Sequence, residues 1–243
     1  MATKDVVILL IGLHGTGKST FTRAATGERV VVGNGVDPCT TKCKKYSVVY
    51  RGKQFAIIDT PGLADRNTVD ENLDILQQIA DQLHKLGQDH VTGVIYFHSI
   101  EGMRIRGVDM DNIRILEAIC GQPFFSRVAF VTTRWDLLKD DQYSGREIVH
   151  QSLQQLCRNL LPNSPDIFRF LNTSESHQPI LDYFFDQESY TEGYGTCPQL
   201  LFAQELERYR WERKPEKAVR KTAAGKQVVA QSRKVRKGIC SFL

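Results

Sequence analysis

The sequence predicts an α/β fold in three layers, with helices on both faces of a mostly parallel, six-stranded sheet that has one antiparallel edge strand. Two observations support this prediction. Short apolar runs rich in β-branched residues alternate with segments whose apolar residues recur every third or fourth position. One pair of runs is joined only by residues 51–54, a link that is too short for anything but an antiparallel hairpin.

Each predicted element follows from one of these two patterns. The expected strands are 6–11, 46–50, 55–58, 91–97, 128–132 and 167–171. The expected helices are 19–25, 69–86, 109–120 and 146–161. Because strands and helices alternate, we expect most strands to be parallel and buried on both faces.

The chain of 243 residues carries a formal net charge of +4, which is unevenly distributed. Residues 208–243 contain 12 Lys and Arg against 2 Asp and Glu, which leaves 20 against 26 in residues 1–207. We therefore predict a nucleotide-binding globular domain over 1–197 and a charged helix with a basic tail over 198–243. Such a tail binds acidic surfaces, either nucleic acid or an anionic membrane, and we favour the membrane.

The C-terminal region has a mixed pattern. An apolar helix face toward the domain is formed by Leu200, Leu201, Ala203, Leu206 and Tyr209. Beyond about residue 214, Pro215 and Gly225 predict helix only in part.

The six cysteines are scattered without a Cys-x-x-Cys pair, so we expect most of them to be reduced and buried, with no zinc site. Without a signal peptide or a long apolar run, we expect a cytoplasmic protein.

The pattern Gly12-x-x-x-x-Gly17-Lys18-Ser19 follows the first predicted strand and begins a helix, as a phosphate-binding loop requires. Its glycines let backbone N–H groups surround phosphates, Lys18 reaches the β- and γ-phosphates, and the Ser19 hydroxyl binds magnesium. The alternative is a glycine-rich turn with no ligand. The loop residues expected to bind nucleotide are Gly12, Gly15, Thr16, Gly17, Lys18, Ser19 and Thr20.

Two further segments complete the phosphate end of the predicted site. Asp59 ends an apolar strand and Gly62 follows in a turn, so the acid suits an indirect magnesium contact and the glycine N–H suits a γ-phosphate. Between the motifs, a polar segment offers a threonine hydroxyl as another magnesium ligand. We choose Thr40, with Thr41 as the alternative, and a plain surface loop remains the other interpretation.

The base end of the site is predicted after the strand at 128–132, in the run Thr133-Arg134-Trp135-Asp136. The Asp136 carboxylate can accept both the N1 and N2 hydrogens of guanine, which adenine cannot offer. The stem or plane of Arg134 can cover the base. After the last predicted strand, Ser176 and His177 are placed to give a backbone N–H to the guanine oxygen.

These motifs together resemble the small GTPase fold of the TRAFAC class. Within it they resemble the septin-like branch, which includes the immunity-associated nucleotide-binding proteins and the chloroplast import receptors. The resemblance covers about residues 5–185 and rests on the phosphate loop, the spacing from Thr40 to Asp59 and the Thr-Arg-x-Asp-Leu run. A Tyr-x-His-x-Ile run followed by Arg-x-x-Gly, with Thr-Thr-Arg-Trp-Asp, is more specifically similar to fungal septin-like GTPases. The resemblance implies a G domain that binds GTP or GDP with Mg²⁺, and relatives that pair nucleotide domains face to face.

Catalysis is expected to be slow, since Ras-like enzymes orient the attacking water with a Gln where this chain has Leu63. Lys18, Thr40 and Gly62 are expected to act at the γ-phosphate, with help from a homodimer. The residues that could contribute to a paired site, or be ordinary solvated loop residues, are His14, Arg66 and Arg104.

Three functions remain open on the sequence. A slow GTPase switch is the leading hypothesis, a GTP-stabilised scaffold with little hydrolysis is the second, and an ATPase or kinase is the third. Asp136 argues against the third, because it matches guanine rather than adenine.

The last four residues, Cys240-Ser241-Phe242-Leu243, fit a C-terminal prenylation signal, with Leu at the end favouring a geranylgeranyl group. One lipid chain binds membranes only marginally, but the basic residues just before Cys240 add to the attraction for an anionic surface. The alternative is an incidental cysteine, since Ser241 is not the aliphatic residue usual at that position.

Overall fold

The structure is a computed structural model of the 243-residue chain. It describes residues 5–30, 32, 40–63, 69–86, 91–102, 104–160, 167–173, 175–194, 198–209 and 215–240. Within these ranges, the backbone alone is described for 160, 187–194, 215 and 232–240.

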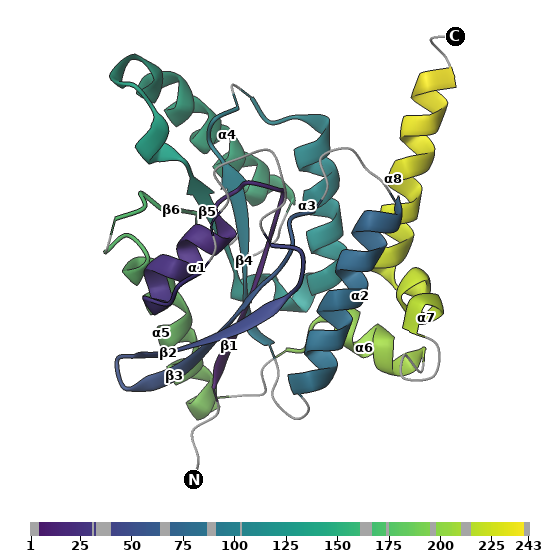
Figure 1. The fold of residues 1–243 in the computed structure, drawn as a ribbon, viewed down its shortest axis with the longest axis horizontal. Helices are drawn as coiled ribbons and strands as arrows, with labels where there is room; N and C mark the ends of the chain where they lie inside the picture. The colour runs from purple at the N-terminus through teal and green to yellow at the C-terminus, as the bar shows by residue number, and fades with distance from the viewer. Residues whose placement is uncertain are drawn as a thin grey trace.

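A six-stranded sheet with the order β2-β3-β1-β4-β5-β6 forms the centre of the molecule (Figure 1). Neighbouring strands are parallel except β2 and β3, which form the antiparallel hairpin at one edge. The predicted fold class is therefore confirmed. The strands are β1 (Val6–Gly12), β2 (Lys44–Tyr50), β3 (Lys53–Asp59), β4 (Val91–Ser99), β5 (Val128–Thr133) and β6 (Ile167–Arg169).

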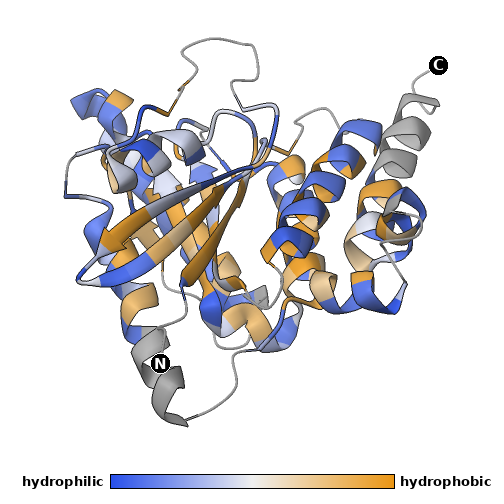
Figure 2. Ribbon diagram, turned by 60° about the horizontal axis from the view of Figure 1, so that its bottom comes forward, coloured by the Kyte–Doolittle hydropathy of each residue, from blue (hydrophilic) through white to orange (hydrophobic). Residues whose placement is uncertain are grey.

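Helices cover both faces of this sheet. They are α1 (Lys18–Thr26), α2 (Val69–Leu86), α3 (Gly107–Cys120), α4 (Tyr143–Leu160), α5 (Gln178–Tyr194), α6 (Leu201–Arg208), α7 (Pro215–Lys221) and α8 (Ala223–Cys240). Short 3₁₀ turns lie at η1 (Gln122–Arg127), η2 (Trp135–Leu137) and η3 (Asp140–Gln142). Figure 2 shows hydrophobic residues concentrated in the central strands, with hydrophilic residues on the outer sides of the helices.

The alternation of side chains along β1 divides the core into two layers. Val7, Leu9 and Ile11 pack in one cluster with residues of α2, α3, α6 and α8. Val6, Ile8 and Leu10 pack in the other with residues of α1 and α5. Every residue of β1 is buried, so the loop that follows Gly12 leaves the sheet at its centre.

Helix α5 was not predicted from the sequence, although it covers much of one face of the sheet. Its buried residues Ile180, Leu181 and Phe184 lie against β1 and β4. Gly93 in β4 has no room for a Cβ, because the ring of Phe184 occupies that space. Gly93 and Phe184, which are 91 positions apart in the sequence (184 minus 93), therefore pack directly against each other.

The prediction of only partial helix after residue 214 is wrong, because α7 and α8 continue to Cys240. Pro215 is the first residue of α7, where a helix needs no N–H donor. At Gly225 a Cβ would overlap the backbone oxygen of Val219, so the glycine allows a tight corner between α7 and α8. Thr222 closes the corner, donating to the Val219 oxygen at 2.7 Å and accepting from the Gly225 N–H at 3.0 Å.

The C-terminal helices pack on the body of the domain, beside α2 and α3 (Figure 1). The predicted apolar face of α6 is present at Leu200 and Leu206, which are buried, and the sequence interpretation missed Phe202, which is fully buried between them. Val228 of α8 joins the same cluster, and the Gln231 amide donates to the Asp111 backbone oxygen at 2.6 Å. The charged region over 198–243 is thus built largely of docked helices in its described part.

Three cysteines can be assessed: Cys43, Cys120 and Cys157 are buried and free. Burial raises the pKa of Cys43 and of Cys157 to about 12, so these thiols stay protonated at neutral pH. Cys39 and Cys197 lie outside the described residues. In the part of the chain that the structure describes, no helix is both long and apolar enough to cross a bilayer.

Candidate functional site

The loop between β1 and α1 has the geometry that a phosphate-binding loop needs. Gly15 and Gly17 adopt left-handed backbone conformations with φ of 70° and 88°. A Cβ at Gly12 would lie 2.6 Å from the backbone oxygen of Phe97, so the loop passes too close to β4 for a larger residue. The Thr16 hydroxyl fixes the turn by donating to the Leu13 oxygen at 2.8 Å.

Lys18 lies under this loop and is only 5% exposed. Its ammonium group donates to the backbone oxygens of Gly12 at 3.1 Å and Leu13 at 2.9 Å. Burial lowers the pKa of Lys18 to about 8, and the nearby Asp59 carboxylate opposes this shift in part. The site therefore holds a cation that is short of negative partners.

Three oxygen donors meet beside the loop, from three segments of the chain. The Ser19 hydroxyl donates to Asp59 Oδ2 at 2.7 Å and lies 2.8 Å from the Thr40 hydroxyl. Thr41 is exposed and makes no side-chain contact with this group within the described residues. The structure thus brings Thr40, rather than Thr41, to Ser19 and Asp59.

Asp59 is 1% exposed, and its Oδ1 has no hydrogen-bond partner among the described residues. Burial raises its pKa, while the Ser19 hydroxyl and the Lys18 charge act in the opposite direction. An unsatisfied buried carboxylate oxygen beside two hydroxyls fits a hard divalent cation such as Mg²⁺, which prefers oxygen ligands.

The turn after β3 is hydrogen-bonded to the phosphate-binding loop. The Leu63 N–H donates to the Gly12 oxygen at 3.0 Å, and the His14 N–H donates to the Leu63 oxygen at 3.2 Å. A Cβ at Gly62 would lie 2.5 Å from the Cα of His14, so only glycine fits there. The Leu63 side chain is 1% exposed and belongs to the core.

On the other side of the loop, a cavity of about 170 Å³ lies at the ends of β5 and β6. The Asp136 carboxylate is exposed there and accepts a hydrogen bond from the Asn172 amide at 3.1 Å. Arg134 does more than border the cavity, because its guanidinium donates to the Gly15 oxygen at 2.8 Å. The cavity is lined by Gly17, Thr20, Arg23, Val32, Thr133, Arg134, Asp136, Leu137, Phe170 and Asn172.

Thr133 joins this cavity to the phosphate-binding loop, since its hydroxyl donates to the Thr16 oxygen at 2.8 Å. Thr133 and Arg134 thus hold consecutive parts of one loop in place.

Ser176 and His177, predicted to contact the base, do not line this cavity in the described part of the chain, and their assignment stays a prediction. The Ser176 hydroxyl instead donates to the Thr173 oxygen at 3.1 Å. Sequence interpretation missed Asn172, which has a left-handed backbone with φ of 57° and reaches Asp136. Its only sequence signal is an Asn directly after a strand, a residue that tolerates this conformation.

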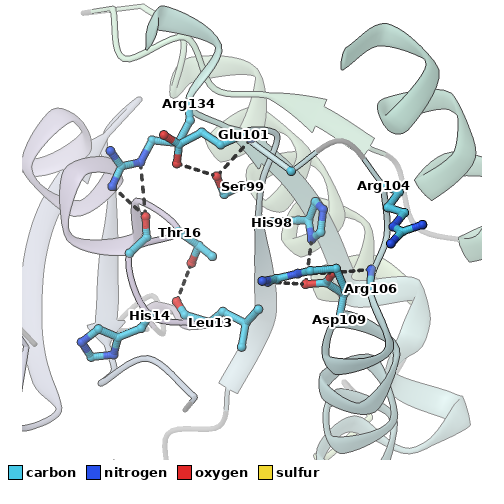
Figure 3. Close-up of a pocket in the computed structure, with 12 residues that line it drawn as sticks. Leu13, His14, Thr16, His98, Ser99, Glu101, Arg104, Arg106, Asp109 and Arg134 are labelled. Carbon is cyan, nitrogen blue, oxygen red and sulfur yellow. Dashed lines mark hydrogen bonds and ion pairs between the residues drawn. The ribbon is translucent and has the colours of Figure 1, made fainter. Parts of the chain in front are cut away.

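A second cavity of about 300 Å³ lies between the loop and the start of α3 (Figure 3). His14 and Arg104 line it, and neither side chain makes a hydrogen bond or ion pair within the described residues. His98 is buried there, 4.0 Å from the Asp109 carboxylate, and burial lowers its pKa. Asp109 is held by the backbone N–H of Arg106 at 2.7 Å. Arg66, the third predicted contributor, lies outside the described residues.

Residues 6–175 of the chain match the AIG1 family. The chain belongs to this family. The match contains every element of the phosphate site and the base cavity up to Asn172.

A curated relative of this AIG1-family chain is the GTPase IMAP family member 8 of Mus musculus, which is 28% identical over 189 residues. That match covers 75% of this chain but 26% of the relative, so the chain spans about a quarter of the relative's length. A GTPase Der of Brucella anthropi is 26% identical over 161 residues, covering 66% of this chain and 30% of that protein.

The fold is shared with solved structures of Toc33 from Arabidopsis thaliana. A dimerization-deficient Toc33 mutant superposes with a TM-score of 0.62 and 18% identity, covering 79% of this chain and 87% of that one. Toc33 in complex with GDP and Mg²⁺ gives a TM-score of 0.59 at 18% identity, covering 76% and 86%. At this level of identity the likeness concerns the fold alone.

The buried Lys18 predicts opposite pH dependences for stability and for phosphate binding in this AIG1-family domain. Above pH 8 the folded, nucleotide-free protein holds a neutral Lys18, while the unfolded chain still binds its proton up to the usual value of 10.5. The unfolded state then binds more protons, so the free energy of unfolding contributed by Lys18 rises over this range. Affinity for GDP should fall about tenfold per pH unit above pH 8, because the cation is lost.

Urea unfolding and GDP titration at several pH values measure both trends, and Lys18→Met, which cannot titrate, is the matched control. If the variant shows the same two slopes as the natural protein, Lys18 is not their source.

Proposed function

We propose that this chain binds GTP with Mg²⁺ and hydrolyses it slowly, acting as a nucleotide-dependent switch. The observation that carries the proposal is the meeting of Ser19, Thr40 and Asp59 beside Lys18, within hydrogen-bond distances of 2.7 and 2.8 Å. These residues are far apart in sequence, and a surface loop without a ligand would not require their side chains to meet. The two relatives reported above are both named as GTPases, which points in the same direction.

Each residue has a distinct part in this proposal. Lys18 and the N–H groups from Gly15 to Thr20 bind the phosphates, and Gly62 contacts the γ-phosphate. Ser19 and Thr40 would hold Mg²⁺, with Asp59 accepting hydrogen bonds from its bound water. When bound, the cation neutralises charge on the phosphate oxygens. Asp136 binds the guanine N1 and N2 hydrogens, and Asn172 orients its carboxylate.

The slow rate follows from the position of Leu63. Its side chain is buried in the core and apolar, so it cannot orient an attacking water. The backbone N–H and the backbone oxygen of Leu63 are both hydrogen-bonded to the phosphate-binding loop.

Thr40→Ala should weaken Mg²⁺-dependent binding of a non-hydrolysable GTP analogue about tenfold, because one ligand oxygen for the cation is lost. Binding of GDP should change less, since the triphosphate state needs this threonine most. Calorimetric titration with and without Mg²⁺ measures the effect. The exposed neighbour provides the control: Thr41→Ala should bind like the natural protein, and a loss there instead would move the assignment to Thr41.

Self-association across the nucleotide face would complete the catalytic site. His14 and Arg104 line one cavity beside the phosphate-binding loop, and both lack partners within the described residues. One solved structure with the same fold comes from the chloroplast translocon components atToc33 and psToc159, for which dimerization is important for GTPase activity. We extend that dependence to this chain.

The burial of Leu63 equally favours a second function, a scaffold that is stabilised by GTP and hydrolyses it only incidentally.

GTP turnover per molecule should rise with protein concentration over a hundredfold range, and Arg104→Ala should flatten this rise. Arg114→Ala, which removes an exposed arginine of α3 that is paired with Asp111, should leave the rise intact. Phosphate release and oligomer size would be measured together with GTP, GDP and a non-hydrolysable analogue. Assembly that depends on GTP with flat, negligible turnover would favour the scaffold.

The C-terminal region suggests a site of action at a membrane. The basic residues just before Cys240 and the terminal Cys-Ser-Phe-Leu run favour a geranylgeranyl group next to an anionic surface, on the cytoplasmic side. We also propose, from the Thr-Thr-Arg-Trp-Asp run, that the chain is related to fungal septin-like GTPases.

Mass spectrometry of the protein from its native host should find a C-terminus that ends at a lipid-modified Cys240. The Cys240→Ser variant should lose binding to vesicles that contain anionic lipid while retaining GDP affinity, because the nucleotide site is unaffected. An unmodified C-terminus ending in Leu243 would contradict the lipid proposal.

A further inference from the structure

The Thr132 hydroxyl lies at the centre of a buried cluster, one residue before Thr133, which lines the base cavity. Thr132 is 0% exposed, and its Oγ1 is 3.1 Å from the Phe168 oxygen, 3.0 Å from Trp135 Nε1 and 3.1 Å from His150 Nδ1. These partners come from β6, from η2 and from α4. One hydroxyl thus connects three elements that meet only in the folded protein.

The donors and acceptors around this hydroxyl fix its role. A carbonyl can only accept, so the Thr132 proton goes to Phe168. The indole N–H of Trp135 can only donate, and it takes one lone pair of the hydroxyl oxygen. The remaining lone pair of the hydroxyl oxygen accepts a hydrogen bond from His150, so the imidazole carries its proton on Nδ1. All three hydrogen-bonding positions of Thr132 are filled, as a buried polar group requires.

Two further contacts hold Trp135 in place, one at its indole ring and one at its backbone. The Arg169 guanidinium lies 4.7 Å from the ring centroid and is itself paired with Glu147 at 2.6 Å. The Tyr143 hydroxyl donates to the Trp135 backbone oxygen at 3.1 Å. With 1% exposure, Trp135 has no freedom to turn outward.

The residues on either side of Trp135 are the ones that border the base cavity. Arg134, with a left-handed φ of 69°, donates to the Gly15 oxygen, and Asp136 faces the cavity beside Asn172. Because Trp135 points into the protein between them, its fixed position determines where both neighbours point.

We propose that Thr132 is a positioning residue for guanine selectivity: through Trp135 and His150 it holds the Asp136 carboxylate in the orientation that accepts two hydrogen bonds from the base. The inference rests on the proposed assignment of Asp136 to the guanine N1 and N2 hydrogens. It predicts that selectivity between purine bases depends on a hydroxyl that touches no ligand.

The test compares binding of GDP and IDP, whose base lacks the 2-amino group and so offers Asp136 one hydrogen bond instead of two. In the full chain, Thr132→Val keeps the shape of the side chain but removes the hydroxyl that accepts from the indole and imidazole N–H groups and donates to the Phe168 oxygen. Its GDP-over-IDP preference should collapse towards parity. Thr132→Ser retains the hydroxyl and should restore the natural preference.

Thr92→Val is the matched control, because Thr92 is also a buried strand threonine that donates to a backbone oxygen, that of Val7 at 2.9 Å, but at the opposite end of the sheet. It should lower the thermal midpoint without changing the GDP-to-IDP ratio. Where Thr132→Val does not fold, Trp135→Phe removes the same indole donor and should lower the ratio in the same direction.

The outcomes separate this inference from the assignment on which it rests. Asp136→Asn should lose the preference for GDP and gain affinity for xanthine nucleotide; if it does not, the base assignment itself fails. If Asp136→Asn behaves as expected while Thr132→Val keeps the natural ratio, the positioning role is wrong. Equal losses of GDP and IDP affinity in Thr132→Val would also overturn it, since they would indicate a structural role only.

Discussion

The burial of β1 on both faces is the constraint on which the rest of the structure depends. A strand with every residue buried must lie at the centre of a parallel sheet, between β3 and β4. Its carboxyl end therefore opens between the carboxyl ends of its neighbours. The phosphate-binding loop is consequently flanked by Asp59 at the end of β3, Ser99 at the end of β4 and Thr133 at the end of β5. The position of a single strand thus assembles the site from segments distant in sequence.

The same geometry explains two buried charges that would otherwise destabilise the fold. Lys18 and Asp59 both lie below the loop. Burial lowers the pKa of Lys18 and raises that of Asp59, so it favours the neutral form of each side chain. Each charge opposes the shift of the other. Among the described residues, however, Asp59 Oδ1 has no hydrogen-bond partner and the Lys18 ammonium donates to two backbone oxygens. Phosphate and a divalent cation offer the complementary charges, so ligand binding is coupled to the stability of the domain.

Local patterns predicted much of this arrangement and failed where contacts are distant. The alternation of strands and helices, and acids such as Asp59 and Asp136 at strand ends, could be predicted because each depends on a few neighbouring residues. Asn172 could not, because its contact with Asp136 depends on a turn that only the folded sheet places there. Pro215 and Gly225 are helix breakers by local preference, yet Pro215 begins α7 and Gly225 fits the close corner between α7 and α8.

The two ends of the site are held with different firmness, and this difference bears on how the domain would act. The predicted base end is held by side-chain hydrogen bonds: Thr133 and Arg134 donate to the phosphate-binding loop, and Thr132 accepts from Trp135, which precedes Asp136. The γ-phosphate end depends on Thr40 and on two backbone hydrogen bonds of Leu63. With the proposed assignments of the two ends, a nucleotide would remain bound through its base and first phosphates while contacts at the γ-phosphate form or break. A switch and a GTP-stabilised scaffold both need that separation, and they differ only in how fast the γ-phosphate is removed.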